Sequence, residues 1–300
     1  HKTLNLISKK RVLLFKYFLM MKKLIALFSF IFSLVILFSC EPGRDENGDL
    51  LFGITNEGQT GGGGTTTGRL LKKMISHEIN DDTGEWEDSE ISYNYTGSKL
   101  ISYVDGSGEP TLFTYNSNNK ISKLSNSGQT ADYEYVGGNV SKITTNISGI
   151  GKITATYTYT GAKLTKSVSI QEYSVPLPFK IYLETTYEYQ GDNVVKSMLK
   201  TGTYLPNGDL EMNPAEDQAL TFAYDAKNSP YKLLPKEFII WLAGIGPQGG
   251  AFLSGNNFTK FGVSVGGQST TENYSYTYDS ENFPTEMKGE GEGFTKYEYQ

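Results

Sequence analysis

Pairs of aromatic residues two positions apart recur from about residue 90 to the C-terminus. Residues two apart in a β-strand lie on the same face, so each pair indicates a strand with one aromatic, core-facing side. The pairs are Tyr93/Tyr95, Phe113/Tyr115, Tyr133/Tyr135, Tyr157/Tyr159, Tyr187/Tyr189, Phe222/Tyr224, Tyr276/Tyr278 and Tyr297/Tyr299. After most pairs comes a short polar turn rich in Gly and Asn, which supply the positive φ of tight hairpins, and then an apolar residue. The pattern therefore predicts a series of β-hairpins.

The spacing of the pairs predicts the architecture of residues 69–300. The intervals from Tyr95 to Tyr115 and from Tyr115 to Tyr135 are 20 residues each, which is the length of two strands and two turns. We expect an all-β domain, an antiparallel meander of repeated hairpins that forms a curled sheet or a barrel-like body. The apolar residues after the turns, such as Ile121 and Leu124, lie three apart rather than two. Either a β-bulge lies there or both faces of the sheet are partly buried.

One segment, residues 231–261, departs from this pattern. Within it residues 238–242, Phe-Ile-Ile-Trp-Leu, are the most apolar stretch after residue 40. We expect a short helical or irregular plug that covers an open end of the curled sheet. The alternative is an exposed apolar patch for a partner, which monomeric proteins rarely leave in water.

The N-terminal part predicts export. Residues 24–38 form an uncharged run of 15 residues behind Lys22 and Lys23. A membrane-spanning helix needs roughly 20 apolar residues, so the run has the length of a signal-peptide core. Residues 1–39 are then a signal-peptide region, with 1–19 upstream of a start at Met20 or Met21. The run ends in Leu37-Phe38-Ser39-Cys40, which resembles a lipobox, and we expect Cys40 to carry acyl chains such as palmitate. A signal anchor that ends near a cysteine is the alternative.

Residues 40–68 read as a lipidated, flexible tether rich in Gly, Thr and acids. A linker of this length and composition holds the body about 30 Å from its anchor. We therefore expect the membrane to be contacted through the N-terminal lipid. The location is then the bacterial outer membrane, with the domain facing the periplasm or the cell surface.

Charge and composition exclude several classes of function. Removing the seven basic residues before Cys40 leaves 20 Lys and Arg against 33 Asp and Glu, a net charge of −13. Such a surface repels phosphate backbones, so no nucleic-acid partner is expected. Cys40 is the only cysteine, and no sequence motif for a catalytic nucleophile, a zinc protease or a phosphate loop occurs. We expect no catalytic residues, cofactor or metal.

Two local groups of side chains have catalytic or metal-binding chemistry. His77 lies between Ser76 and Glu78, but neighbouring strand residues point to opposite faces, so the three cannot form a catalytic triad by themselves. Residues 80–85 contain three acids, and residues 290–292 add two more. Calcium binding is the alternative to the solvated hairpin tips that we expect there.

The chain has 21 tyrosines and two tryptophans. Cross-strand aromatic packing is the plain explanation, because the tyrosines recur at the same position of each repeat. A ligand-facing surface that stacks on sugars or peptides is the alternative. The aromatics that would form it are Tyr95, Tyr115, Tyr135, Tyr159, Tyr189 and Trp241.

The repeated Tyr-x-Tyr-x-Gly units loosely resemble the YD-type repeats of RHS proteins. Residues 224–231 and 276–285 are similar to a family of Bacteroidota lipoproteins of unknown function with a porin-like β fold. The resemblance implies a fold and a location but no reaction. It does not imply a pore, since charged residues interrupt the strands where a membrane barrel needs apolar bands.

We therefore expect a monomeric, non-enzymatic, lipid-anchored binding or scaffold module for extracellular glycan or protein. One alternative is a hydrolase whose carboxylates gather from separate strands in the mouth of the curled sheet. The other is a purely structural component of the envelope.

Overall fold

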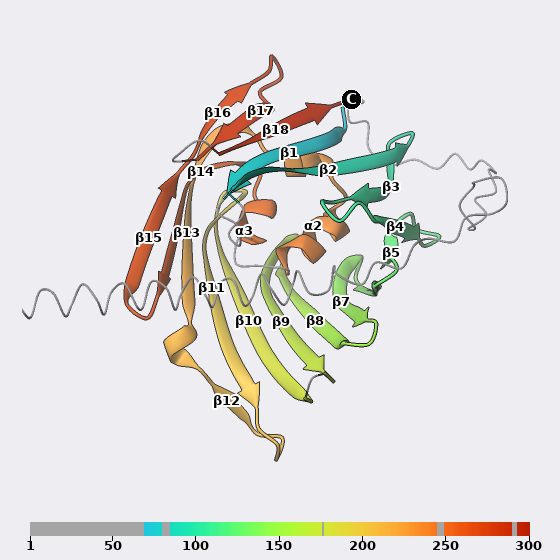
Figure 1. Ribbon diagram of the computed structural model, residues 1–300, viewed down its shortest axis with the longest axis vertical. Coiled ribbons are helices and arrows are strands. Elements are labelled where there is room, and N and C mark those ends of the chain that lie inside the picture. Colours follow the sequence, from blue (N-terminus) through green and yellow to red (C-terminus); the bar gives the residue numbers. More distant parts are fainter. Residues whose placement is uncertain (1–68, 80–84, 176, 245–248, 290–292) are drawn as a thin grey trace, which may run out of the picture. The chain divides into compact units, whose positions relative to one another are not determined.

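The computed structural model describes residues 69–79, 85–175, 177–244, 249–289 and 293–300. All of these belong to one compact unit, built on an 18-stranded antiparallel sheet (Figure 1). The sheet curls into a nearly closed, barrel-like body with two short α-helices, which confirms the all-β class expected from the sequence. Among the described residues, no helix is both long enough and apolar enough to cross a membrane.

The strands follow the hairpin pattern of the sequence. The first nine are β1 (Leu71–Ile79), β2 (Trp86–Thr96), β3 (Lys99–Val104), β4 (Pro110–Tyr115), β5 (Ile121–Ser125), β6 (Gln129–Val136), β7 (Asn139–Ile147), β8 (Gly151–Thr160) and β9 (Lys163–Tyr173). The others are β10 (Phe179–Gln190), β11 (Asn193–Tyr204), β12 (Leu210–Met212), β13 (Gln218–Asn228), β14 (Asn256–Val265), β15 (Gln268–Asn273), β16 (Ser275–Tyr278), β17 (Pro284–Lys288) and β18 (Phe294–Tyr299).

Strand pairing follows chain order around the body. Each of β1 to β11 pairs with the strand that follows it, except that β11 pairs with both β12 and β13. The short β12 therefore forms a side hairpin. β15 pairs with β14, and its continuation β16 pairs with β17. β18 then pairs with β1, so the last strand closes onto the first.

A β-bulge recurs at the second aromatic residue of the repeat. The register shifts between Thr114 and Tyr115, where Tyr115 pairs with Ile121 and leaves Ser122 as the extra residue. Equivalent shifts precede Tyr95, Tyr135, Tyr159, Tyr189, Tyr224 and Tyr278. An extra residue moves the inward-facing positions by one, so both Ile121 and Leu124 face the core. The bulge is thus the explanation of the three-residue spacing.

The core lies inside the curled sheet, between the strands and a plug (Figure 1). The plug consists of η2 (Pro230–Leu233), α2 (Lys236–Ala243) and α3 (Gly249–Phe252), while η1 (Pro214–Glu216) follows β12. Phe238 of α2 is 1% exposed, and its ring centroid lies 5.1 Å from those of Tyr103 and Phe113. The prediction of a helical plug at residues 238–242 is therefore confirmed.

α3 packs more closely still against the inner face of the sheet. A Cβ atom on Gly250 would lie 3.0 Å from side-chain atoms of Phe222 and Val194, so a larger residue there would require these side chains to move. Ala251 belongs to the same buried cluster as Leu164 and Tyr187. The two helices therefore identify which side chains of each strand point inward.

Candidate functional site

The tyrosines of the repeat form hydrogen bonds between successive hairpins. The second tyrosine of a pair donates its hydroxyl to the backbone carbonyl of the first buried residue of an earlier strand. These bonds are Tyr95 to Leu71, Tyr115 to Leu100, Tyr135 to Ile121, Tyr189 to Leu164, Tyr224 to Val194 and Tyr299 to Pro284. The bulge disrupts the ladder at these positions, and the hydroxyl gives the carbonyl a partner.

Lysine side chains cover several of the same rings. The Nζ atom of Lys99 lies 4.0 Å from the ring centroid of Tyr115, and that of Lys163 lies 5.2 Å from the ring of Tyr189. Two second tyrosines depart from this hydrogen bonding: the Tyr278 hydroxyl donates to the Asp225 carboxylate, and the buried Tyr159 hydroxyl has no partner. Trp241 is half-buried against the ring of Phe238.

Of the six aromatics predicted as ligand-facing, five are tyrosines of the repeat that lie around the plug, and Trp241 belongs to the plug itself. Their hydroxyl and ring contacts within the chain favour packing over ligand binding. Burial raises the pKa of Tyr103 and Tyr187 to about 12, because the phenolate form is poorly solvated inside the barrel. The ligand-facing role of these aromatics stays a prediction.

His77 is placed on the outer face, as a surface histidine. Its ring stacks between Trp86 and Phe294, with centroids at 4.9 and 5.1 Å, and its Nδ1 atom lies 2.7 Å from Asp88 Oδ1. Among the contacts of the described residues, no serine joins His77 and Asp88, so a Ser-His-acid triad does not form there.

Two carboxylates do face each other at the mouth of the sheet. Glu78 of β1 and Glu87 of β2 are directly opposite in the register, and both are exposed. No cluster of three or more metal-binding side chains occurs among the described residues. Cys40, the tether, residues 80–84 of the acidic turn and residues 290–292 lie outside the described part of the chain, so the predictions made for them stay predictions.

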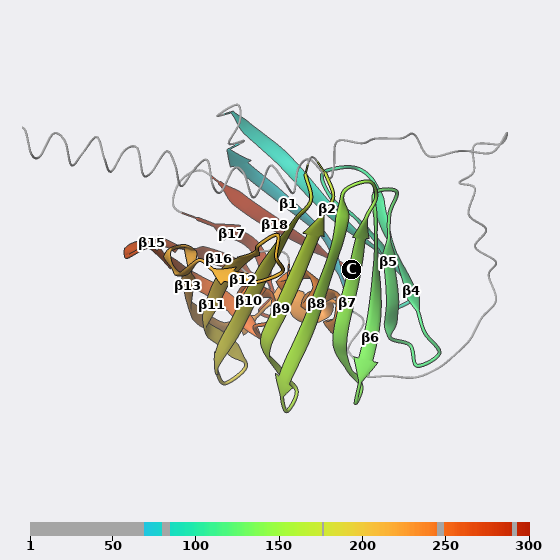
Figure 2. The same ribbon diagram turned by 90° about the horizontal axis from the view of Figure 1, so that it is seen from below.

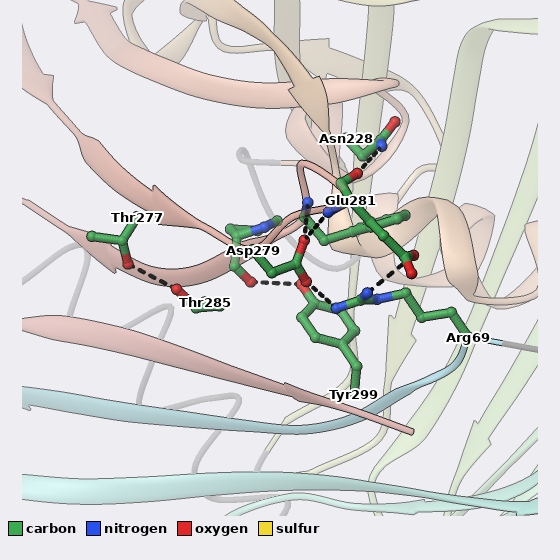
Figure 3. A network of polar contacts seen from close by, with 9 residues as sticks. Arg69, Asn228, Thr277, Asp279, Glu281, Thr285 and Tyr299 are labelled. Carbon is green, nitrogen blue, oxygen red and sulfur yellow. Dashed lines mark hydrogen bonds and ion pairs between the residues drawn. The ribbon is translucent and has the colours of Figure 1, made fainter.

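A polar network holds the point where the sheet closes (Figure 3). The Arg69 guanidinium forms ion pairs with Asp279 and, at 3.1 Å, with Glu281. It also lies over the ring of Tyr299, at 4.2 Å from the centroid. Asp279 accepts backbone hydrogen bonds from Glu281 and Phe283, which orders the β16–β17 turn. Asp279 and Glu281 both bind Arg69, and Asp279 also orders the turn, so we infer that this network stabilises the closure of the sheet.

The strands β8 to β11 separate charge by face (Figure 2 shows them side by side). The contacts with the helices show which side chains of these strands point inward. When the bulges are included in the register, no inward position of the four strands carries a charged residue. The outward positions carry ion pairs, such as Lys166 with Glu184 at 2.5 Å and Lys152 with Glu172 at 3.0 Å. These lysines lower the pKa of Glu184 and of Glu172, chiefly through side-chain hydrogen bonds. The lysines and acids of these four strands therefore all lie on the outward face, as they also do on β6 and β7.

The inward side chains of β8 to β11 that lie beyond the plug form a surface, which we name the inner wall. On β9 it is polar, with Ser169, Gln171 and Tyr173, and the residues beside these three on β8 and β10 are mainly apolar. The flanking residues are Ile153 and Ala155 of β8, Phe179, Ile181, Leu183 and Thr185 of β10, and Leu199 and Thr203 of β11. All but the exposed Phe179 and Thr203 are half-buried.

The inner wall ends at an aromatic pair. Tyr173 and Phe179 lie opposite each other across β9 and β10, with ring centroids 4.6 Å apart and planes 20° from parallel. The Tyr173 hydroxyl donates to the Gln171 side-chain carbonyl at 2.9 Å. At the β11 side, Thr201 lies on the inward face between Leu199 and Thr203 and donates a hydrogen bond to Glu216 of η1, so this acid lies at the β11 edge of the wall. The wall therefore offers neutral hydrogen-bonding groups beside apolar surface.

Sequence reasoning missed the inner wall. The alternation of charged and uncharged residues in β8 to β11 was present in the sequence. The bulges next to Thr165 and Val195 shift the alternation by one residue. Counting residues along the sequence therefore does not show which positions face the inside of the sheet.

No protein-family model matches the chain, and no curated protein matches it. Among solved structures, the chain is similar to the crystal structure of a porin-like protein from Bacteroides uniformis. The two share 13% sequence identity at a TM-score of 0.47, over 77% of this chain and 96% of the other. At that identity and TM-score, the likeness carries no argument about function.

Proposed function

We propose that this protein is an exported, lipid-anchored envelope module that binds an extracellular ligand without changing it chemically. The observation that carries the proposal is the inner wall, a concave, half-buried surface without charge on strands whose outward face is held by ion pairs. Half-buried groups of mixed polarity on the inside of a curled sheet are the usual lining of a binding site. The acids and lysines on the outside instead keep that face in water.

The proposed location rests on the N-terminal sequence and on the outer face. The uncharged run at 24–38 followed by Cys40 supports a lipid anchor. The outward ion pairs of β8 to β11 support an aqueous surrounding for the body, because lipid-facing charges cost about 2–4 kcal/mol each at the bilayer centre. The anchor would then hold a water-exposed, monomeric domain at the membrane.

Anchoring is tested on the full chain extracted from membranes, by intact mass, together with protease shaving of whole cells. We expect the wild type to begin at an acylated Cys40 and the Cys40→Ala variant to lack the lipid and leave the membrane fraction. Retention of residues before Cys40 in the wild type would contradict the lipid anchor.

Non-enzymatic binding is tested against the hydrolase alternative. Glu78 and Glu87 are the directly opposed carboxylates of the described mouth, so a hydrolase would depend on them. We expect a bound glycan or peptide to be recovered with unchanged mass, and Glu78→Gln and Glu87→Gln to leave binding within about twofold of the wild type. Turnover that is lost in either variant would establish the hydrolase instead.

A further inference from the structure

We infer that the inner wall binds a neutral glycan, with the sugar chain lying along β9 and one ring seated against the Tyr173–Phe179 pair. This inference rests on the proposed binding function and names its ligand class. It is drawn from the order of the side chains along the wall.

The absence of charge selects a neutral ligand. Every ion pair of β8 to β11 lies on the outward face, so an acidic ligand on the inner wall would have no counter-charge from these strands, and a basic ligand would have none along β9. Burying an unpaired charge is strongly unfavourable. Glu216, at the β11 edge of the wall, would further repel an acidic sugar.

The polar column on β9 selects a glycan over a hydrocarbon chain. Ser169 and Gln171 carry hydroxyl and amide groups, and each lies between apolar residues of the adjacent strands. A lipid tail placed there would remove the Ser169 hydroxyl and the Gln171 amide nitrogen from water without giving them a partner, at about 1–3 kcal/mol for each group. A sugar ring has hydroxyl edges and apolar faces, so it satisfies the β9 column and covers Ile181 and Leu183 at the same time.

The aromatic pair supplies a platform at the end of this column. Phe179 is 40% exposed although its ring stacks on Tyr173, so one part of the pair remains accessible to solvent. The Gln171 carbonyl orients the Tyr173 hydroxyl, which limits the rotation of that ring. A pre-oriented aromatic surface beside hydrogen-bonding groups binds with a smaller loss of conformational entropy.

The experiment is affinity electrophoresis of the detergent-extracted full chain through gels that contain soluble starch, xylan, mannan or β-glucan. Gels with polygalacturonate serve as the acidic comparison. We expect at least one neutral polysaccharide to retard the wild type and polygalacturonate not to retard it. Gln171→Ala and Tyr173→Ala should each weaken the binding about tenfold, the effect of losing roughly 1.4 kcal/mol.

Glu172→Gln is the matched control, because Glu172 lies between those two residues and points outward. It should bind within twofold of the wild type, and the thermal midpoints of all three variants show whether each is folded. The inference is wrong if no neutral polysaccharide retards the wild type, or if Glu172→Gln loses as much affinity as Gln171→Ala.

A second probe separates this inference from the proposed function. A fluorescent fatty acid that binds the wild type and is lost in Gln171→Ala, with no polysaccharide retardation, would overturn the glycan but leave a binding module. If neither a polysaccharide nor the fatty acid binds the acylated protein, the binding function itself fails with the inference, and the structural alternative stands.

Discussion

The tyrosine hydroxyls of the repeat connect hairpins that are distant in the sequence. Tyr115 donates to the carbonyl of Leu100 at 2.6 Å, and Tyr189 donates to that of Leu164 at 2.9 Å. Each acceptor is the residue just before a bulge, where the ladder is interrupted. Tyr159 occupies the equivalent position, but its hydroxyl is buried without a partner. The hydroxyl group of the second tyrosine therefore contributes differently to the free energy of unfolding in different hairpins.

This difference gives a paired test at the residue scale. Tyr115→Phe removes a hydrogen bond and should lower the free energy of unfolding by about 1 kcal/mol. Tyr159→Phe removes an unpartnered buried hydroxyl and should leave stability unchanged or raise it. Urea unfolding of both variants measures the difference. Equal destabilisation by the two substitutions would show that the hydroxyl bonds do not act as described.

Buried tyrosines also predict sensitivity to alkali. The pKa of Tyr103 and of Tyr187 is raised from 10.0 to about 12 by burial, so the unfolded chain loses these protons more readily than the folded chain. Their contribution to stability is therefore complete below pH 10 and is lost as the pH rises through 12. We expect the urea midpoint to fall above pH 10, together with the appearance of tyrosinate absorbance. Full tyrosinate formation near pH 10 in a protein that stays folded would contradict this.

At the scale of elements, the plug depends on the sheet. α2 has eight residues, too few for a stable isolated helix in water, and no side chain caps its N-terminus. Its buried residues Phe238, Ile239 and Ile240 face strands that come more than 90 residues earlier in the chain. The helix is therefore stabilised by packing on the inner face of the sheet, and the sheet in turn gains its core.

Truncation of the plug tests this dependence. Phe238→Ala should lower the free energy of unfolding by about 3–5 kcal/mol, because a ring buried between Tyr103 and Phe113 leaves a cavity. Val136→Ala is the control, since Val136 is 72% exposed at the end of β6 and should change stability by less than about 0.5 kcal/mol. Calorimetry or urea unfolding gives both values. A loss below about 1 kcal/mol for Phe238→Ala would mean that the plug is not part of the cooperative core.

For the folded unit as a whole, the decisive contact is between its first and last strands. Tyr299 pairs with Leu71, and the backbone groups of Leu70 and Gln300 exchange two hydrogen bonds. A register shift between Leu71 and Lys73 reproduces there the bulge of the repeat. Arg69 fixes this junction to the β16–β17 turn (Figure 3). The ends of the described chain therefore complete the sheet as one more repeat.

Substitution of Arg69 tests closure. Arg69→Met should lower the free energy of unfolding by about 1.5–3 kcal/mol, the value of hydrogen bonds to charged groups. It should also speed amide exchange at Leu70 and Gln300. Arg69→Lys keeps the charge but loses the planar guanidinium, so we expect an intermediate effect. Unchanged exchange at Gln300 in Arg69→Met would show that the backbone pairing holds the junction by itself.

Local sequence was sufficient for the repeat and the plug. Aromatic pairs two apart, glycine turns such as the one at Gly161 with φ of 59°, and the apolar run at 238–242 are each encoded within a few residues. Such features depend on backbone preference and side-chain alternation, which act over short distances. The tether, the lipid anchor at Cys40 and the glycan or protein partner remain predictions from the same sequence.

The tertiary structure alone decided which face each residue occupies and what it contacts. A bulge shifts the inward side by one position, so the uncharged inner wall emerges only when the strands are paired in their true register. The acceptors of the tyrosine hydroxyls and the partner of Arg69 are likewise set by the closed sheet. Arg69 and Asp279 are 210 residues apart in the chain, and only the pairing of β18 with β1 brings them together. Local preference determines hairpins, whereas register and closure depend on contacts that no local pattern specifies.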